Sequence, residues 1–211
     1  MTFETQDNEY HYITDRDTYS FYNEVDPDIR NRVIETLCTV DEGAGENNRI
    51  GHHILTRALE LRGSISLPTI ETHSASDPAW DQIRLILFVD RQNDDEVTPQ
   101  EFLLTSMFSQ TGEQIPSTAF YNPQGFGRFQ ILDDRTWTLT YATMDTDTLI
   151  GVSTQILLTY DNLQYDILYD AGTISSGNPW EHITSNNIKL IVLTKHGIAE
   201  YDLFWRLYFE G

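Results

Sequence analysis

The sequence predicts an all-β fold, a single jelly-roll β-sandwich of two four-stranded antiparallel sheets with long loops. Three observations support this prediction. Roughly eight or nine segments alternate apolar and polar residues with the period of a half-buried strand. Only one short helix is indicated, so the regular strand–helix alternation of a parallel sheet is missing. Long polar connections separate several strands, as they do in sandwiches and barrels.

The longest predicted strand runs from Leu55 to Leu67. Its odd positions are apolar except at Arg57 and Gly63, and its even positions are mostly polar, which predicts one buried face. This strand exceeds the length of about five or six residues that is typical of strands. A glycine-rich loop over residues 42–51 precedes it. We expect the other strands to pair with this one or to pack against it.

Residues 1–32 form an acidic segment with interleaved aromatic side chains. Disordered segments are poor in aromatic residues, so we expect this one to pack on a neighbouring surface as an N-terminal arm. The predicted division is therefore an arm over residues 1–32 and a jelly-roll domain over residues 33–211. That domain begins with a strand in residues 33–40 (VIETLCTV), with Val33 and Leu37 directed inward.

Residues 81–91 are apolar on both faces of a predicted strand. Such a strand is central in its sheet, and we expect its outer face to be covered by another part of the chain or by another subunit. The short helix is predicted over residues 100–108, with Thr98 as its N-cap and Pro99 at its first position.

Residues 128–141 predict two short strands, Phe129–Ile131 and Trp137–Tyr141, joined by a tight turn at Asp133 and Asp134. Further strands follow toward the C-terminus. They cover residues 152–160, 165–169, 188–195 and 201–209.

Aromatic residues are frequent, with 11 Tyr, 10 Phe and 4 Trp. Filling of the core explains most of them. In the last strand, however, Phe204 and Tyr208 lie on the face opposite Trp205 and Phe209. Since aromatic residues favour interfaces, we expect this outer face to contact the N-terminal segment or a neighbouring subunit. A carbohydrate-binding platform is the competing use of these side chains.

The chain is strongly acidic, with 33 acidic and 13 basic residues and a net charge of −20. Such a chain repels polyanions at long range and lacks the basic footprint of most nucleic-acid-binding proteins. Its single cysteine, Cys38, excludes an intrachain disulfide. No apolar run is long enough to span a membrane, and we expect no membrane partner.

We predict no catalytic residue, metal site or cofactor. The sequence contains no nucleophile elbow, no phosphate-binding loop and no His-Glu-x-x-His zinc motif. His52 and His53 are adjacent, so they point to opposite faces of a strand and do not share a metal ion. Two acidic loops offer the oxygen ligands that calcium prefers, without EF-hand spacing, and we expect them to be solvated. They lie in residues 90–96 and 145–147.

Three segments carry more specific motifs. Residues 42–65 (EGAGENNRIGHHILTRALELRGSI) combine a glycine-rich turn, an Arg-Ile-Gly step and a long strand with a Leu-Arg-Gly ending. Residues 81–92 (DQIRLILFVDRQ) end in Asp-Arg-Gln, and residues 128–139 (RFQILDDRTWTL) place Asp-Arg-Thr between aromatic residues. Together, in this order, they resemble the capsid proteins of circular single-stranded DNA viruses that encode a replication initiator (CRESS-DNA viruses), the circovirus- and geminivirus-like group. The motifs cover residues 33–141.

The resemblance implies a non-enzymatic viral capsid protein. Copies of one jelly-roll subunit would assemble into a small icosahedral shell around a circular single-stranded DNA genome. The protein would reside in the virion after assembly in the host cell or its nucleus, with its loops at subunit contacts and at the outer surface that a host receptor binds. The alternative is a soluble or cell-surface β-sandwich binding module, lectin- or cytokine-like.

Members of this family normally begin with a basic arm that neutralises the packaged DNA. Here residues 1–32 hold eight acidic residues and three basic ones, which are our candidate nucleic-acid-binding residues: Arg16, Arg30 and Arg32. Affinity for a polyanion scales with the number of phosphates neutralised, so these few groups need an explanation. Three remain open: an upstream basic arm, a separate basic protein or polyamine, or a lineage that packages its genome differently.

Overall fold

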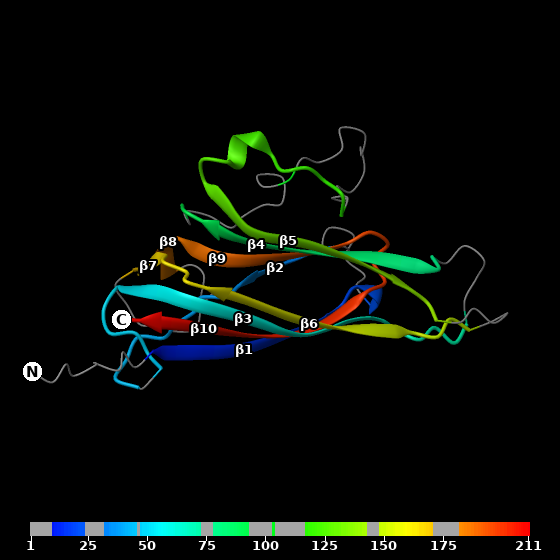
Figure 1. Ribbon diagram of the computed structural model, residues 1–211, viewed down its shortest axis with the longest axis horizontal. Helices are drawn as coiled ribbons and strands as arrows, with labels where there is room; N and C mark the ends of the chain where they lie inside the picture. Colours follow the sequence, from blue (N-terminus) through cyan, green and yellow to red (C-terminus); the bar gives the residue numbers. More distant parts are fainter. Residues whose placement is uncertain are drawn as a thin grey trace, which may run out of the picture.

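The computed structural model describes residues 10–23, 32–45, 47–72, 78–92, 103, 117–142, 148–170 and 182–211. Within these ranges, two antiparallel sheets face each other across one core, which confirms the predicted β-sandwich (Figure 1). Both sheets contribute buried apolar side chains to this core, among them Leu61, Ile65, Leu87, Val192 and Leu203. Removal of this surface from water is the main force that holds the two layers together.

The larger sheet contains six strands, in which β10 lies between β1 and β3, while β6 and β7 share the other side of β3. These strands are β1 (His11–Ser20), β3 (His53–Leu67), β6 (Val152–Asp161), β7 (Asp166–Tyr169), β8 (Ile183–Ser185) and β10 (Glu200–Glu210). The smaller sheet has the order β2-β9-β4-β5. Its strands are β2 (Arg32–Thr36), β4 (Trp80–Asp90), β5 (Phe129–Thr140) and β9 (Asn187–Thr194). Two short 3-10 turns, η1 (Phe21–Asn23) and η2 (Pro123–Gly125), complete the described elements.

The prediction of four strands in each sheet is correct for the smaller sheet and wrong for the larger one. β3 is 15 residues long, and β6 covers only its part from Ala58 to Leu67. The start of β3, His53–Leu55, pairs instead with β7, which β8 extends. Without these two short strands, the orders β1-β10-β3-β6 and β2-β9-β4-β5 are those of a jelly roll.

A bulge at Arg57 changes which side chains of β3 enter the core. The pairing with β10 shifts there, since Ala58 lies opposite Tyr208 while Thr56 lies opposite Phe209. One extra residue reverses the alternation between the two faces. Ile54 therefore points into the core, and Leu55, which the alternation predicts inside, is only half-buried.

The outer face of β4 is buried, as its two apolar faces predict. Ile86 and Phe88 form a second, smaller cluster with Leu103 and Ala119, so another part of the same chain covers the sheet. Leu103 forms an isolated bridge with Tyr121. The other residues of the helix predicted over 100–108 lie outside the described part of the chain.

The tight turn predicted at Asp133 and Asp134 is wrong, because β5 continues without interruption through both residues. Their carboxylates are bound by side chains. Asp134 accepts hydrogen bonds from Arg84 Nε and Nη2 at 2.8 and 2.6 Å, and Asp133 accepts one from the Tyr160 hydroxyl at 2.7 Å. With these partners and no glycine, the segment remains extended.

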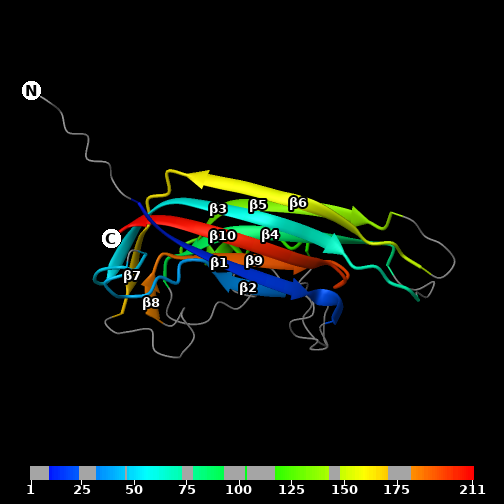
Figure 2. The ribbon, with the colours of Figure 1, turned by 90° about the horizontal axis from the view of Figure 1, so that it is seen from below.

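The described part of the N-terminal segment belongs to the larger sheet. β1 pairs antiparallel with β10 along its whole length, and Figure 2 shows β1, β10, β3 and β6 side by side. The rings of Tyr12 and Tyr208 are 6.2 Å apart, and the Arg16 guanidinium lies over the Phe204 ring. The contact predicted between the outer aromatic residues of the last strand and the N-terminal segment is therefore confirmed.

Candidate functional site

The exposed face of the larger sheet combines arginine and aromatic side chains from three neighbouring strands. Strand pairing places Arg16 of β1 beside Phe204 of β10, and Phe204 beside Arg62 of β3. One row further along the strands, Thr14 lies beside Arg206. We call this surface the arginine face and define it by Arg16, Arg62, Phe204 and Arg206. Alternation of side chains along each strand directs all four away from the core.

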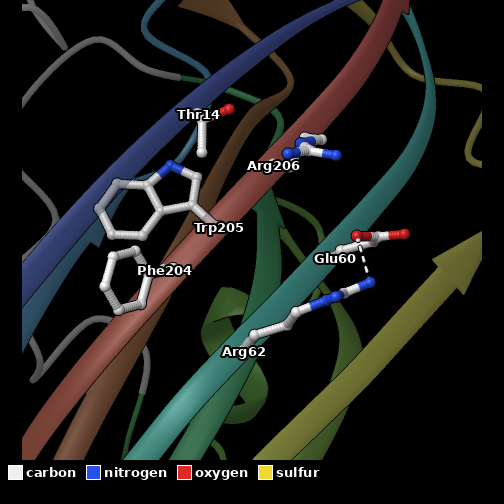
Figure 3. A pocket seen from close by; sticks show the side chains of 6 residues that line it. All are labelled: Thr14, Glu60, Arg62, Phe204, Trp205 and Arg206. Carbon is white, nitrogen blue, oxygen red and sulfur yellow. Dashed lines mark hydrogen bonds and ion pairs between the residues drawn. The ribbon is translucent and has the colours of Figure 1, made fainter.

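A shallow pocket of about 180 Å³ lies in the middle of the arginine face. Figure 3 shows its lining side chains, which come from β1, β3 and β10. They are Thr14, Glu60, Arg62, Phe204, Trp205 and Arg206. The pocket therefore offers an aromatic ring, two guanidinium groups, one carboxylate and one hydroxyl group to a ligand.

Two of the arginines on this face form ion pairs with neighbouring acids. Arg16 donates from Nε and Nη2 to the two carboxylate oxygens of Asp202 at 2.9 and 2.8 Å, and this hydrogen bonding raises the pKa of Arg16. Arg62 donates from Nη2 to Glu60 at 3.0 Å. Both pairs are exposed, so solvent screens them and each contributes little to stability.

Arg206 differs because no carboxylate among the described residues forms an ion pair with it. Its guanidinium donates a hydrogen bond to the Tyr208 hydroxyl at 3.3 Å and lies over the Tyr12 ring, 4.9 Å from the centroid. These contacts hold the planar group in place where it lines the pocket, within reach of the charge of Glu60. A guanidinium fork held in this way is suited to bind a phosphate or carboxylate.

The structure separates the three sequence-predicted site residues. Arg16 lies on the arginine face, Arg32 begins β2 in the other sheet, and Arg30 lies outside the described residues. Sequence reasoning did not identify Arg62 and Arg206 as site residues. The pattern that could have identified them is the set of charged and aromatic residues at the exposed positions of β3 and β10. This pattern predicts a shared site only when the two strands are known to be neighbours.

A second set of exposed side chains is apolar and lies on loops and on an outer strand. Their exposed fractions are large: Ile50 75%, Leu157 66%, Phe120 81% and Phe126 61%. Ile50 projects from the glycine-rich loop, which folds around the buried Arg49. That guanidinium donates from Nε to the Val40 carbonyl at 3.2 Å and lies over the Tyr169 ring at 4.4 Å. Apolar side chains mark a contact surface where they gather in a patch, and among these four Phe120 and Phe126 lie close together in sequence, on either side of η2.

Among the described residues, no group of three or more His, Cys, Asp or Glu side chains is placed to hold a metal ion, and the absence of a metal site stays a prediction. His53 bonds through Nδ1 to Asp166 at 3.2 Å. Asp90, from one of the acidic loops, is buried and bound by Arg128 Nε at 2.8 Å and by Lys189 Nζ at 3.5 Å. Residues 93–96 and 145–147 of the two loops lie outside the described ranges.

Comparison of the chain with protein-family models and with curated proteins finds no match. In the part of the chain that the structure describes, no helix has the length and apolarity needed to cross a membrane. Arguments about function therefore rest on the fold, the arginine face and the exposed apolar side chains.

Proposed function

We propose that this protein is a viral capsid protein that assembles into a small icosahedral shell around a circular single-stranded DNA genome. The observation that carries the proposal is the jelly-roll order of the eight longer strands. Viral capsids and lectins are built on this fold. The motifs in residues 42–65, 81–92 and 128–139 favour the capsid among these uses. The proposal assigns no catalysis to the chain and places it in the virion, with assembly in the host cell or its nucleus.

Exposed apolar side chains support self-assembly. Phe120 lies before the η2 turn and Phe126 directly after it, whereas Ile50 projects from the glycine-rich loop. In a shell of identical subunits, each copy uses several surface patches for different neighbours. Burial of these side chains against other copies would remove them from water, at roughly 25 cal/mol per Å² of apolar surface.

The arginine face is the surface that we propose for contact with packaged DNA. Bases stack on exposed aromatic rings such as Phe204, and guanidinium groups such as Arg62 and Arg206 bind backbone phosphates. Because Glu60 and Asp202 compensate two of the three arginines, the proposed contact is weak for each subunit. In a shell, many copies would contact the same DNA molecule, so that the overall affinity would exceed that of one subunit.

The assembly proposal is tested by size-exclusion chromatography and negative-stain electron microscopy of purified protein. We expect uniform closed particles, and we expect Phe120→Ser with Phe126→Ser to give a small, folded species. Gln124→Ser in the same loop is the matched control and should still assemble. A small species for the unmodified chain across salt, pH and calcium concentrations would refute self-assembly.

The DNA-contact proposal is tested separately by fluorescence anisotropy with a labelled oligothymidylate. Replacement of Arg62 and Arg206 by Gln should weaken binding at least about fivefold and flatten the salt dependence. Replacement of Arg91, directly after β4, and Arg135, in β5, by Gln removes two other exposed arginines and should have little effect. Equal losses in both variants would show that net charge alone, and not this face, governs binding.

The pocket also favours a second candidate, a lectin-like binding module. In a shallow pocket of about 180 Å³, an aromatic ring lies beside guanidinium, carboxylate and hydroxyl groups, which are the kinds of group that stack on a sugar ring and bind its hydroxyls. This function predicts a monomer or small oligomer that binds glycans and loses binding in Phe204→Ala. A glycan array on the unassembled protein distinguishes it from the capsid.

A further inference from the structure

On the side away from β1, the outermost strand of the larger sheet is β6 (Figure 2). Among the described residues it pairs with β3 alone, and its register continues without a shift from Val152 to Asp161. No backbone group of the described chain bonds to its other side. β6 therefore presents a row of backbone donors and acceptors along an edge that is ten residues long.

The other edge strands of the described chain have features that normally prevent contact between edges, namely interior charges or short length. β1 and β5 each contain three charged residues in their interior, whereas β2 and β8 are only five and three residues long. In contrast, β6 (VSTQILLTYD) has no proline and no charged residue before Asp161, its last residue. It therefore lacks the protection that the other edges have.

The side chains of β6 that point away from the core suit contact with a second β6 strand. Exposed positions alternate with buried ones, and Leu157 in the middle of the strand is 66% exposed. Gln155 and Thr159 lie on either side of it, and both are exposed, uncharged and able to donate and accept hydrogen bonds. Two such surfaces can meet without placing like charges opposite each other.

We propose that the β6 edge binds the β6 edge of a second copy of this chain, antiparallel and around a two-fold axis at Leu157. A two-fold contact requires a self-complementary surface, and β6 provides one. Main-chain hydrogen bonds would supply affinity, and facing side chains would fix the register. The facing pairs would be Leu157 with Leu157, Gln155 with Thr159, Ser153 with Asp161, and Ile156 with Leu158.

Side-chain alternation restricts this register, because residues that face each other in an antiparallel pair lie on the same face of the sheet. An axis at Leu157 pairs the strands from Ser153 to Asp161 and buries the exposed leucine at the centre. The two Asp161 carboxylates then lie at opposite ends of the contact, roughly 26 Å apart at about 3.3 Å per residue. This separation exceeds the Debye length of about 8 Å at 0.15 M, so salt screens their repulsion.

The proposed contact joins two larger sheets edge to edge and leaves both arginine faces on the same side, because its two-fold axis is perpendicular to the sheet. Arg62 is the neighbour of Leu157 on β3. The Arg62 positions of the two copies would be separated only by the two β6 strands, roughly 14 Å at about 4.8 Å per strand. The dimer goes beyond the proposed function, because it requires neither a closed shell nor DNA.

Sedimentation velocity of the Phe120→Ser, Phe126→Ser variant tests the dimer separately from shell formation. We expect a concentration-dependent dimer. Leu157→Glu in this background places two carboxylates opposite each other and should weaken dimerisation at least about tenfold. Leu168→Glu, on β7 of the same sheet, adds the same charge at another exposed leucine and should leave the dimer unchanged. A monomer at every protein concentration, or the same weakening by both glutamates, would overturn the proposal.

Disulfide cross-linking tests the register in the otherwise unmodified chain, whose single cysteine, Cys38, is buried. Leu157→Cys should form a covalent dimer under mild oxidation, because facing Cβ atoms lie about 4.5–5.5 Å apart. Gln155→Cys alone should not, since its two copies would lie roughly 13 Å apart along the strands, whereas a mixture with Thr159→Cys should. Closed shells in which Leu157→Cys does not cross-link would overturn the dimer and leave the capsid proposal intact. Cross-linked dimers without shells would support the dimer and not the capsid.

Discussion

At the scale of single residues, Asp81 illustrates how one buried side chain organises a distant turn. Its carboxylate accepts hydrogen bonds from the backbone N–H groups of Lys195, His196, Ile198 and Ala199 at 2.8 to 3.1 Å. These residues form the turn between β9 and β10. Asp81 therefore connects the start of β4 to the strand that carries half of the arginine face.

Asp81→Ala should lower the free energy of unfolding by about 3 kcal/mol, because several backbone donors in a buried turn would lose their charged acceptor. Urea denaturation measures the loss. Asp166→Ala is the control, since its carboxylate is 57% exposed and its removal should cost less than about 0.5 kcal/mol. Similar losses in the two variants would show that the Asp81 hydrogen bonds add nothing specific.

Gly63 is required by a close approach between β3 and β10. Its φ is +153°, and a Cβ atom there would overlap the Asp202 carbonyl oxygen and lie 3.0 Å from the Leu203 Cα. Gly63→Ala should cost about 2 kcal/mol through displacement of β10. Gly127→Ala, where no atom lies within 4 Å of the added Cβ, should change the melting temperature little. Thermal unfolding of both variants, followed by circular dichroism, measures these two changes. Equal melting temperatures for the two variants would contradict the prediction.

At the scale of elements, β5 is held to its surroundings by acid–tyrosine contacts on both sides. Asp134 binds Arg84 and the Tyr121 hydroxyl, and Asp133 binds Tyr160 of β6 in the other sheet. The Arg84 guanidinium also donates to the Ala119 carbonyl at 2.7 Å. β5 thus links the smaller sheet to the covering segment and to the larger sheet.

These contacts predict acid sensitivity. Burial raises the pKa of Asp134, but hydrogen bonds from Arg84 and Tyr121 outweigh it, so the net pKa lies below the ordinary 3.8. A lowered pKa gives stability that is present above the ordinary value and lost as the pH falls through the folded-state value. Asp134→Asn should destabilise the protein by about 1 kcal/mol at pH 6, and the difference should shrink toward pH 2.

Urea midpoints at pH 6, 4 and 2.5 measure this convergence. Asp161→Asn at the exposed end of β6 serves as the control, because its carboxylate makes no ion pair with any described residue. A constant difference between Asp134→Asn and the unmodified chain at all three pH values would contradict the prediction.

At the scale of the whole molecule, net charge opposes self-assembly. A subunit with a charge of −20 repels its copies, and salt screens this repulsion, with a Debye length of about 30 Å at 0.01 M and about 8 Å at 0.15 M. We therefore expect the assembled fraction to rise between 0.02 and 0.5 M NaCl in sedimentation velocity experiments. The Phe120→Ser, Phe126→Ser variant should stay unassembled at every concentration. An assembled fraction that falls with salt would instead indicate ion pairs between copies.

Much of the fold follows from local sequence, whereas the candidate site does not. The alternation in residues 55–67 and the doubly apolar segment at 81–91 predict β3, β4 and their burial. The uninterrupted β5 was not predictable, since Asp133 and Asp134 favour a turn until Arg84 and Tyr160 are placed beside them. The candidate Arg16 does lie on the arginine face, but nothing local pairs it with Phe204, which is far away in the sequence.

The sequence by itself determined that this chain forms an antiparallel sandwich, because alternation with a period of two is a property of consecutive residues and specifies one buried face for each strand. Tertiary structure alone decided the bulge at Arg57, the division of β3 between β6 and β7, and the pairing of Arg16 with Phe204. These features depend on the register between distant strands. Register results from how all side chains of two layers fit together, and no single segment of the chain encodes it.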